Sequence, residues 1–365
     1  MTAIEISHDV LTESFERTAT GLARTYRIGD ETYTSDLVTD HDSGDDRGDW
    51  WRGFLDGATP IARDQRGRLR TLDLFCGPGG LALGFGQAAR ELGYDVVSEA
   101  ALDGDEGAHQ VYRANHSTRT AATAPIGNQI IDYQVRGVAE KARFRYTPEI
   151  LDDRFAHLPG SVDAVLAGPP CQGHSNLNNH TRRSDRRNEL YLAVPAFAVA
   201  VDASMVVIEN VPAVIHDRQQ VVATTTRLLQ EAGYEVVTGR FFADRLGWPQ
   251  TRQRFFLLAR KDRQPLDPTV VQVALEQPQP RPLWWAIEDL EDEPVDGLMT
   301  LPVEWSDENR RRIQWLFDND AHNLPAAERP ECHQDGTTYN AVYGRLFQDR
   351  PAPTITSGFM TPGRG

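Results

Sequence analysis

Cys171 is the residue of this chain best placed to act as a nucleophile. It lies in the segment GPPCQGHS (168–175), directly after the apolar run VDAVLAG (162–168), which predicts a buried strand. Two prolines stiffen the backbone before the cysteine, and the polar, turn-forming flanks favour an accessible thiol rather than a buried one. The other two cysteines, Cys76 and Cys332, are interpreted as inert.

An acid and two arginines follow in similar positions. Glu209 closes the apolar run SMVVIEN (204–210), and an acid that is desolvated at a strand end can hold a proton near neutral pH. Arg252 and Arg254 lie two residues apart before another apolar run, so they share one face of an extended segment. The simpler alternatives, a helix-capping acid and solvated arginines, stay open at this point.

A glycine-rich turn predicts a ligand site. DLFCGPGG (73–80) lies between a strand and a helix, where glycines let the backbone approach a ligand and the helix N-terminus favours a negative group. Asp103 and Asp105 follow the next strand, where an acid can accept hydrogen bonds from ribose hydroxyls. Together these features indicate an adenosine-type cofactor, although acids at this position also commonly start helices.

The elements that must position these groups alternate between strands and helices. The predicted strands are 70–75, 95–103, 162–168, 204–210, 234–241 and 254–260. The predicted helices are 81–93, 189–201 and 218–233. Apolar strands separated by helices predict an α/β fold, a mostly parallel, doubly wound Rossmann-like sheet whose ligands bind at the carboxyl ends of the strands.

The ends of the chain differ in texture from this middle part. Residues 1–69 are predicted to be an extension, with one amphipathic helix through Leu11, Phe15, Leu22 and Tyr26 and a mobile acidic linker at 40–49. Residues 70–261 form the predicted catalytic domain. An irregular, proline- and tryptophan-containing region covers 262–350, and 351–365 is the start of a return to the catalytic domain.

Charge is unevenly distributed along the 365 residues. The formal net charge is −15, from 38 Lys plus Arg and 53 Asp plus Glu, and residues 1–50 alone hold twelve acids against four arginines. Residues 182–187 carry a net charge of +3, and residues 240–263 carry +5. These two patches flank the motifs above, so the acidic total does not exclude contact with nucleic acid.

Composition excludes several classes of protein. No run approaches the eighteen apolar residues of a membrane span, and the N-terminus shows no signal peptide. Three distant cysteines predict neither a disulfide framework nor a metal site. We therefore expect a cytoplasmic protein that needs no metal.

In order and spacing, the motifs resemble those of the DNA (cytosine-5) methyltransferase family. The segments that match are DLFCGPGG (73–80), PPCQ (169–172), DRRNELY (185–191), ENV (209–211), QTRQR (250–254) and PTIT (353–356). The resemblance implies a class I fold that binds S-adenosylmethionine, together with a small target-recognition region at 262–350. It also implies methyl transfer to C5 of a flipped cytosine through a covalent adduct with Cys171.

The resemblance assigns roles residue by residue. It implies that Glu209 stabilises the adduct, Arg254 contacts the base and Arg252 supports the nucleophile loop. The cofactor residues that it implies are Phe75, Gly77, Pro78, Gly79, Gly80, Asp103, Gly104, Pro170 and Leu190. The DNA-contacting residues that it implies are Gln172, Ser175, Arg182, Arg183, Arg186 and Arg187.

The sequence also departs from the family pattern. Gly104 stands where a large residue often stacks on adenine, and His174 stands where an aromatic residue is common. After a long insertion at 117–148, Asp152 or Asp153 is the candidate for the third cofactor motif. The family's last two motifs are not found, which predicts that a partner chain or a further segment completes the cofactor domain.

The resulting hypothesis is a bacterial, cytoplasmic DNA cytosine-5 methyltransferase of a restriction-modification or related system. It would act on double-stranded DNA as a monomer. Two alternatives stay open. One is a tRNA cytosine-5 methyltransferase with the same motifs, and the other is a non-catalytic or incomplete chain that needs a partner.

Overall fold

The computed structural model describes residues 11–124, 126, 129–170, 190–291, 304–335 and 343–355. The chain forms two compact units. The first, here called the sheet unit, comprises Met1–Phe241 and Arg254–Leu275, and the second unit comprises Phe242–Gln253 and Glu276–Gly365. This division joins the N-terminal extension to the sheet, whereas the boundaries predicted from sequence separate the two.

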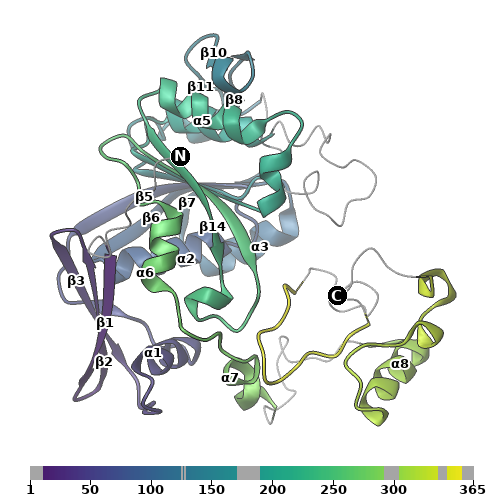
Figure 1. Cartoon of the computed structure of the whole chain (residues 1–365). Coiled ribbons are helices and arrows are strands. Elements are labelled where there is room, and N and C mark those ends of the chain that lie inside the picture. Colours follow the sequence, from purple (N-terminus) through teal and green to yellow (C-terminus); the bar gives the residue numbers. More distant parts are fainter. Residues whose placement is uncertain are drawn as a thin grey trace, which may run out of the picture. The chain divides into compact units, whose positions relative to one another are not determined.

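A seven-stranded sheet with the order β14-β15-β13-β12-β5-β6-β7 forms the sheet unit's centre (Figure 1). Its strands are β5 Gly67–Leu74, β6 Tyr94–Asp103, β7 Thr118–Thr123, β12 Ala164–Ala167, β13 Met205–Asn210, β14 Glu235–Phe242 and β15 Gln253–Arg260. The strands β7, β6, β5, β12 and β13 pair in parallel, and β15 is antiparallel to β13. The predicted Rossmann-like α/β fold is confirmed.

Helices cover both faces of this sheet. On one face α4 (Ala193–Ala200) and α5 (Val221–Glu231) bury the main apolar core against β5, β12 and β13. On the other face α2 (Gly80–Glu91) and α3 (Glu106–Asn115) enclose a small cluster around Tyr112. All predicted strands and helices of this part are present, with α4 starting later than predicted. Strand β7 lies inside the segment that the sequence marked only as an insertion.

The order of the strands reverses between β5 and β12. From β5 the chain adds β6 and β7 on one side, then crosses to place β12 and β13 on the other. Residues Ala167 and Leu74 are register partners, so the two strands end side by side. Ligands of open α/β sheets bind beyond such a point, where the two departing loops leave a crevice. The glycine-rich turn and the Pro-Pro segment start at these two ends.

The insertion between β7 and β12 consists mainly of short pieces. Four two-residue strands pair there as two antiparallel ladders, β8 with β11 and β9 with β10. They are β8 Ile131–Asp132, β9 Val135–Arg136, β10 Arg143–Phe144 and β11 Glu149–Ile150. Ile131 is fully buried in the main core, so the insertion packs against the sheet unit.

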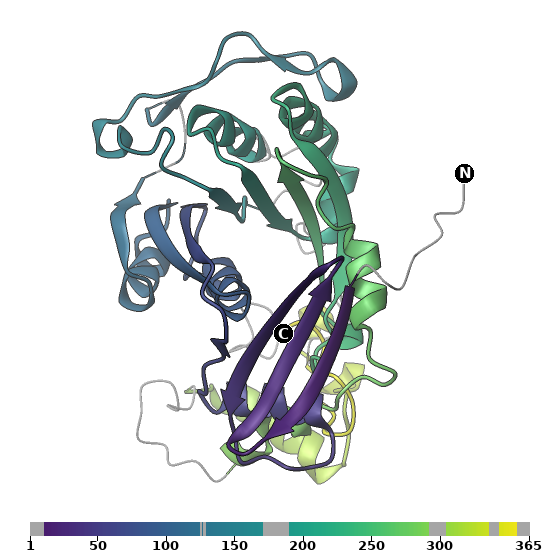
Figure 2. The ribbon, with the colours of Figure 1, turned by 90° about the vertical axis from the view of Figure 1, so that its left-hand side faces the viewer.

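The predicted N-terminal amphipathic helix is wrong. Residues 11–28 instead form a β-hairpin, β1 (Leu11–Thr18) and β2 (Gly21–Ile28), which continues into β3 (Glu31–Val38) and β4 (Ile61–Ala62) as a four-stranded sheet (Figure 2). Residues four apart share a face of a strand as well as a face of a helix. Glu13 lies between Leu11 and Phe15 on the buried face of the hairpin, and Arg24 lies between Leu22 and Tyr26 on the same face. Because these two positions are charged, the sequence does not show the apolar residue at every second position that predicts a strand.

The predicted mobile linker at 40–49 is also wrong. Helix α1 (Asp46–Leu55) begins inside it, and the side chain of Asp45 caps the helix by accepting a hydrogen bond of 2.9 Å from the Gly48 amide. Asp49 is buried and accepts hydrogen bonds from Ser43 and Arg17. The acids of this segment therefore cap and stabilise the N-terminus of α1.

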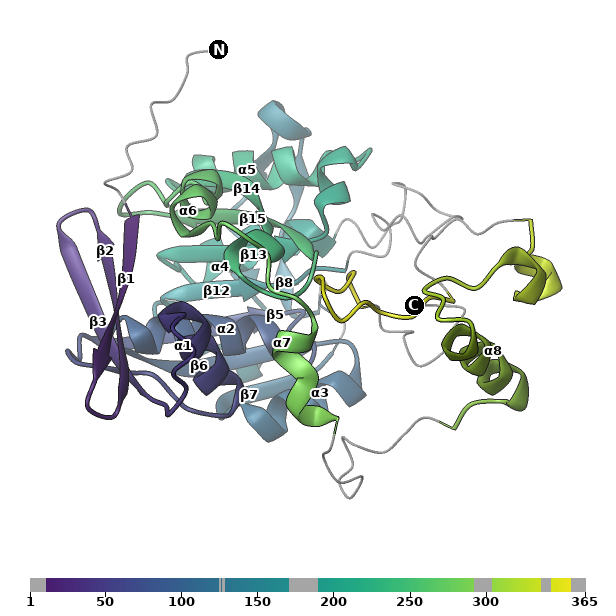
Figure 3. The ribbon, with the colours of Figure 1, turned by 60° about the horizontal axis from the view of Figure 1, so that its bottom comes forward.

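The N-terminal sheet packs on the rest of the sheet unit. Helix α1 covers β1 and β3, while α2 contacts β3 and β4 (Figure 3). Helix α6 (Pro268–Leu275) lies against β1. Residues Trp50, Leu22 and Leu37, all fully or almost fully buried, form a separate small core under the N-terminal sheet. Residues 11–62, here called the N-terminal module, are thus an integral part of the sheet unit.

The second unit has little regular structure. It contains α7 (Trp284–Ile287) and α8 (Asp307–Asp318), and Leu316 of α8 packs on Leu324 and Tyr343. Segments 322–324 and 343–345 run antiparallel through the bridge between Asn323 and Gly344. Among the residues that the structure describes in either unit, none of the helices is both long and apolar enough to span a bilayer.

Trp50→Ala tests whether the N-terminal module folds with the protein. Trp50 is fully buried and meets Phe15 edge to face, so we expect a loss of about 3–5 kcal/mol in the free energy of unfolding. Urea denaturation measures it. Leu55→Ala, on the same helix but 44% exposed, serves as the control. A Trp50→Ala loss no greater than the control's would contradict the packing described here.

Candidate active site

The turn after β5 has the backbone of a ligand cradle. Phe75, Gly77 and Gly79 all adopt positive φ, at 54°, 51° and 95°. Gly79 is the N-cap of α2, and a Cβ atom at this position would lie 2.3 Å from Nε2 of His116. Only glycine fits there. The turn therefore brings its backbone and the N-terminus of α2 to the carboxyl end of β5.

Asp103 fastens this turn to the end of β6. Its carboxylate accepts one hydrogen bond of 2.8 Å from the Gly77 amide and another of 2.8 Å from the Asp105 amide. Asp105 in turn caps α3 by accepting from the Ala108 amide at 2.8 Å. Each carboxylate oxygen keeps a further lone pair, so Asp103 can still accept from a ligand hydroxyl.

Gly104 lies exposed between these two acids. An added Cβ atom would meet no heavy atom within 4 Å, and the residue does not adopt positive φ. The position therefore has room for the large side chain that the family pattern often places there. Pro78 is exposed in the neighbouring turn, and Gly80 opens α2.

Asp73 is a functional candidate that the sequence reasoning did not assign a role. It is 1% exposed on β5, and neither of its carboxylate oxygens makes a hydrogen bond of normal geometry. Burial, together with the nearby Asp103, raises the pKa of Asp73 to about 8, and the Tyr112 hydroxyl offsets part of the rise. The signal in the sequence was an acid inside an otherwise apolar strand.

The end of β12 is held against both of its neighbours. The Gly168 amide donates to the carbonyl of Leu74 on β5 at 3.2 Å. On the other side, Nδ2 of the buried Asn210 donates to the carbonyl of Pro169 at 3.1 Å. The Asn210 side chain also accepts from the Val211 amide at 2.8 Å. Asn210, which sequence reasoning left without a role, thus fixes the backbone just before the half-buried Pro170.

Glu209 and Arg254 form an ion pair at the same edge. Glu209 and Phe256 are register partners in β13 and β15, so Arg254, two residues before Phe256, shares the face of Glu209. Nε of Arg254 lies 2.6 Å from a carboxylate oxygen of Glu209, and the two side chains are 21% and 28% exposed. The pair is accessible enough to meet a ligand.

Tyr191 lies in the core close to this acid. Its hydroxyl is buried without a hydrogen-bond partner, and burial, with Glu209 adding to it, raises the pKa of Tyr191. Leu190, the predicted cofactor contact, precedes it and is half-buried at the start of a short turn. Arg252 belongs to the second unit, where its carbonyl accepts from the Ala243 amide at 2.9 Å.

Several predicted site residues lie outside the described residues. They are Cys171, Gln172, Ser175, Arg182, Arg183, Arg186 and Arg187. Among the candidates for the third cofactor motif, Asp152 is bound to Arg154, which holds the pKa of that carboxyl below its usual range. In the parts of the chain that are described, no group of three or more His, Cys, Asp or Glu side chains could hold a metal ion.

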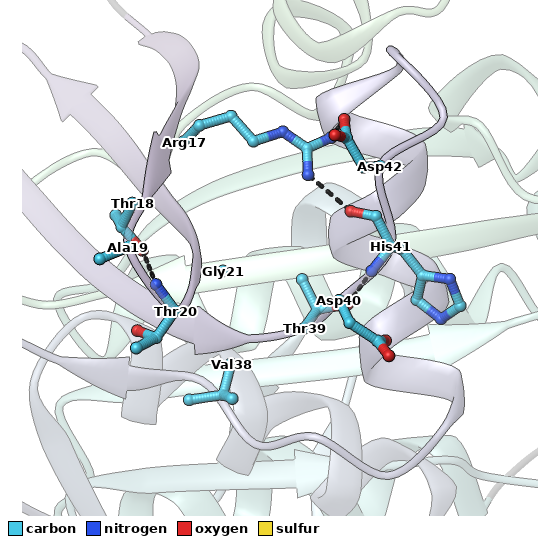
Figure 4. Close-up of a pocket in the computed structure, with 10 residues that line it drawn as sticks. All are labelled: Arg17, Thr18, Ala19, Thr20, Gly21, Val38, Thr39, Asp40, His41 and Asp42. Atoms are coloured by element: carbon cyan, nitrogen blue, oxygen red, sulfur yellow. Dashed lines mark hydrogen bonds and ion pairs between the residues drawn. The ribbon is translucent and has the colours of Figure 1, made fainter.

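A groove of about 620 Å³ lies on the N-terminal module, between the β1–β2 turn and residues 38–42 (Figure 4). Arg17, one of the charged side chains that line the groove, donates hydrogen bonds to Asp46, Asp49 and the His41 carbonyl. The groove contains none of the motif residues. The candidate active site is instead the carboxyl edge of β5, β6, β12 and β13.

Comparison with known proteins identifies the family of the chain. Residues 69–323, more than two thirds of the chain, match the family model of C-5 cytosine-specific DNA methylases. Type II methyltransferase M1.BsuMI of Bacillus subtilis (strain 168) is 38% identical over 80% of this chain and 66% of its own length. DNA (cytosine-5)-methyltransferase 1 of Mus musculus is 30% identical over 55% of this chain and 12% of its own length.

The chain therefore spans just under two thirds of the bacterial relative and a small part of the mouse one. Among solved structures, the S. pombe Dnmt2 methyltransferase aligns with a TM-score of 0.42 at 19% identity, over 67% of this chain and 65% of that chain. A likeness this distant carries no argument. The fold assignment rests on the strand order.

Asp73→Asn tests the buried acid. Between about pH 4 and pH 8 folded Asp73 holds a proton that the unfolded chain has released, so stability falls as the pH rises. The slope is up to about 1.4 kcal/mol per pH unit. Asparagine should flatten this fall, measured by urea denaturation at steps from pH 5 to 8.5. Asp95→Asn, an exposed acid on β6, should leave the slope unchanged. If the free energy of unfolding falls equally with pH in Asp73→Asn and in the wild type, the raised pKa of Asp73 does not cause the fall.

Proposed function

Because the chain belongs to the C-5 cytosine-specific DNA methylase family, we propose that it transfers a methyl group from S-adenosylmethionine to C5 of cytosine in double-stranded DNA. The observation that carries the proposal is the Glu209–Arg254 ion pair, which lies at the edge of the sheet where Asn210, on the opposite face, holds the Pro169 carbonyl. The acid and the guanidinium therefore lie at the end of β13, and the neighbouring parallel strand β12 leads into the Pro-Pro-Cys segment.

The cofactor residues fit the chemistry of S-adenosylmethionine. The cofactor has a carboxylate, an ammonium group, a sulfonium and a ribose, and it supplies an electrophilic methyl group when bound. The N-terminus of α2 favours a carboxylate, while Asp103 can accept from ribose hydroxyls. The buried Asp73 without a normal hydrogen bond adds negative charge beside a cationic ligand when it ionises.

In the proposed mechanism the residues activate the base rather than the cofactor. The Cys171 thiolate bonds to C6 of a flipped cytosine, and the electron pair of the C5–C6 bond makes C5 nucleophilic. Glu209 shares a proton with N3 and so stabilises the adduct, and Arg254 orients Glu209 while contacting the base carbonyl. C5 would accept the methyl group as the bond between that methyl group and the sulfonium sulfur breaks, which leaves S-adenosylhomocysteine. C5 would then lose its proton to solvent as the C6–S bond breaks, which returns Cys171 as a thiolate.

DNA contacts in this proposal come from the segment after the nucleophile. Arg182, Arg183, Arg186 and Arg187 would clamp phosphates, with Gln172 and Ser175 closer to the flipped base. Arg252 would support the nucleophile loop.

We place the activity in a restriction-modification setting in a bacterial cytoplasm, supported by the name of the Bacillus subtilis relative. Action as a monomer, and a partner chain or segment that completes the cofactor domain, stay predictions.

Cys171→Ala should abolish both methyl transfer and the covalent trap with a C5-substituted cytosine analogue, because no other thiolate attacks C6. Labelled methyl transfer to duplex DNA and gel-shift of the trapped adduct measure these. Cys332→Ala is the matched control and should retain both. Activity in Cys171→Ala, or labelling of tRNA rather than duplex DNA by the wild type, would sink the proposed mechanism or substrate respectively.

Gly104→Trp should tighten cofactor binding. Position 104 is open, and an indole stacking on adenine is worth about 0.5–1.5 kcal/mol, or about two- to tenfold in Kd. Calorimetry with S-adenosylmethionine measures it. Gly104→Ala separates stacking from the general effect of replacing glycine. If the tryptophan variant binds no tighter than the alanine variant, the cofactor's adenine does not lie at this position.

A further inference from the structure

The N-terminal module buries charged side chains that the reaction mechanism does not use. On the inward face of the hairpin, the side chains of Glu13 and Arg24 are 2% and 5% exposed. Nε of Arg24 donates to Glu13 Oε1 at 2.7 Å across the β1–β2 pair. Burying such charges costs several kcal/mol per ion unless partners compensate. Further partners, Glu91 and Arg47, therefore extend this pair into a buried network.

On one side the network ends at α2, here called the cofactor helix because it follows the glycine-rich turn. Nη1 of Arg24 donates to Glu91 at 3.1 Å, and Glu91, 7% exposed, is the last residue of α2. Burial raises the pKa of Glu91 while Arg24 opposes the rise. A carboxylate at the C-terminal end of a helix is disfavoured by the helix dipole, so this end of α2 depends on Arg24. The opposite end of α2 starts at the glycine turn.

Aromatic rings hold the Arg24 guanidinium in place. Tyr26 and Trp51 have ring centroids 4.5 and 4.9 Å from its central carbon, and Phe15 and Trp50 lie at 5.6 Å. Such contacts favour a cation over a ring face and leave the planar group few other orientations. Arg24 is therefore a rigid link between β2 and α2.

On the other side the network ends where the chain leaves the sheet unit. Arg47 of α1 forms an ion pair with the second carboxylate oxygen of Glu13. Nη1 of Arg47 also donates to the Leu275 carbonyl at 3.1 Å. Leu275 is the last residue of α6 and of the sheet unit, and the second unit resumes at Glu276. Glu13 thus joins two arginines that reach the cofactor helix and this exit point.

We infer that Glu13 is a positioning residue that couples cofactor binding to DNA binding. The inference rests on the proposed function, in which the glycine turn holds the cofactor, and on the target-recognition role that the family resemblance implies for residues 262–350, most of which follow Leu275. Cofactor binding restrains α2, and the chain Glu91–Arg24–Glu13–Arg47–Leu275 restrains the carbonyl from which the recognition region departs. By linkage, DNA then strengthens cofactor binding by the same factor.

Stability alone does not account for this arrangement. Two carboxylates and two guanidiniums are buried or nearly so, and well-packed apolar residues are often as stable as buried ion pairs. An apolar interior would also fix α2, but it would not fix a single hydrogen-bonded geometry at the Leu275 carbonyl. The charge-assisted hydrogen bonds specify that geometry.

The test measures a coupling factor. It is the ratio of the Kd for a duplex without and with saturating S-adenosylhomocysteine, which cannot transfer a methyl group. The duplex carries the site found by methylation mapping of cells that express the protein, and fluorescence anisotropy gives Kd. We expect a factor of about five or more for the wild type, the lower end of typical couplings. Glu13→Gln should bring it close to one.

Two control variants separate coupling from stability. Leu37→Ala removes a buried side chain of the same module and keeps the network, so it should lose stability but keep the factor. Asp36→Asn removes an exposed ion pair with Arg63 in the same sheet and should change neither. If Glu13→Gln does not fold, Arg47→Lys replaces it, because that side chain is 17% exposed and lysine cannot make both contacts.

The outcomes are distinct. A wild-type factor of one, with both ligands bound, would overturn the inference. So would equal losses of the factor in Glu13→Gln and Leu37→Ala. A wild type that binds neither S-adenosylhomocysteine nor DNA would instead overturn the proposed function.

Discussion

The parallel pairing of β5 with β12 is the constraint on which the candidate site depends. These strands are adjacent in the sheet but far apart in sequence, and their register brings Leu74 beside Ala167. The hydrogen bond from the Gly168 amide to the Leu74 carbonyl continues the pairing to the point where both loops depart. Because parallel strands end at a common edge, the glycine turn and the Pro-Pro segment become neighbours. A shift in the register of β5 against β12 would move the glycine turn away from the Pro-Pro segment.

Much of this arrangement could be predicted from the sequence because its signals are local. Apolar runs mark β5, β12 and β13, and the segment 218–233 shows the period of α5. The candidate roles of Glu209 and Arg254 come from the family resemblance, and their positions at a strand end and a strand start are visible in the sequence. Their pairing could not be predicted without the antiparallel register of β13 and β15, since residue spacing along the chain says nothing of which strands are neighbours.

The N-terminal module shows where such reasoning fails. A strand that faces a core is expected to alternate apolar and polar residues, but here Glu13 and Arg24 occupy inward positions. Pattern analysis treats a charge as exposed, so the apolar residues four apart were assigned to a helix. Asp73 was overlooked for the related reason that burial of an acid depends on tertiary contacts. In both cases a polar group occupies a position that the pattern predicts to be apolar, and Glu13 and Arg24 use theirs to form buried ion pairs.

The acidic character of the N-terminal segment also has a different meaning in the folded protein. Asp46 and Asp49 bind Arg17, Asp36 binds Arg63, and Glu13 is shared by two arginines. These four of the twelve acids counted along residues 1–50 are therefore paired with arginines, and three of these arginines belong to the same segment. These ion pairs give the acids specific structural contacts, while the segment keeps its net negative charge.

The reversed direction of β15 has a consequence for how such a protein can diverge. Because β15 runs against its neighbour β13, its first residues lie at the edge where β13 ends, and Arg254 reaches Glu209 from there. The chain then follows β15 to the opposite edge of the sheet and passes through α6 before the second unit resumes at Glu276. Insertions and replacements after Leu275 are thereby separated from the ion pair by a full strand and a helix. Segments of different length and sequence can therefore be exchanged after Leu275 without a change at the Glu209–Arg254 ion pair.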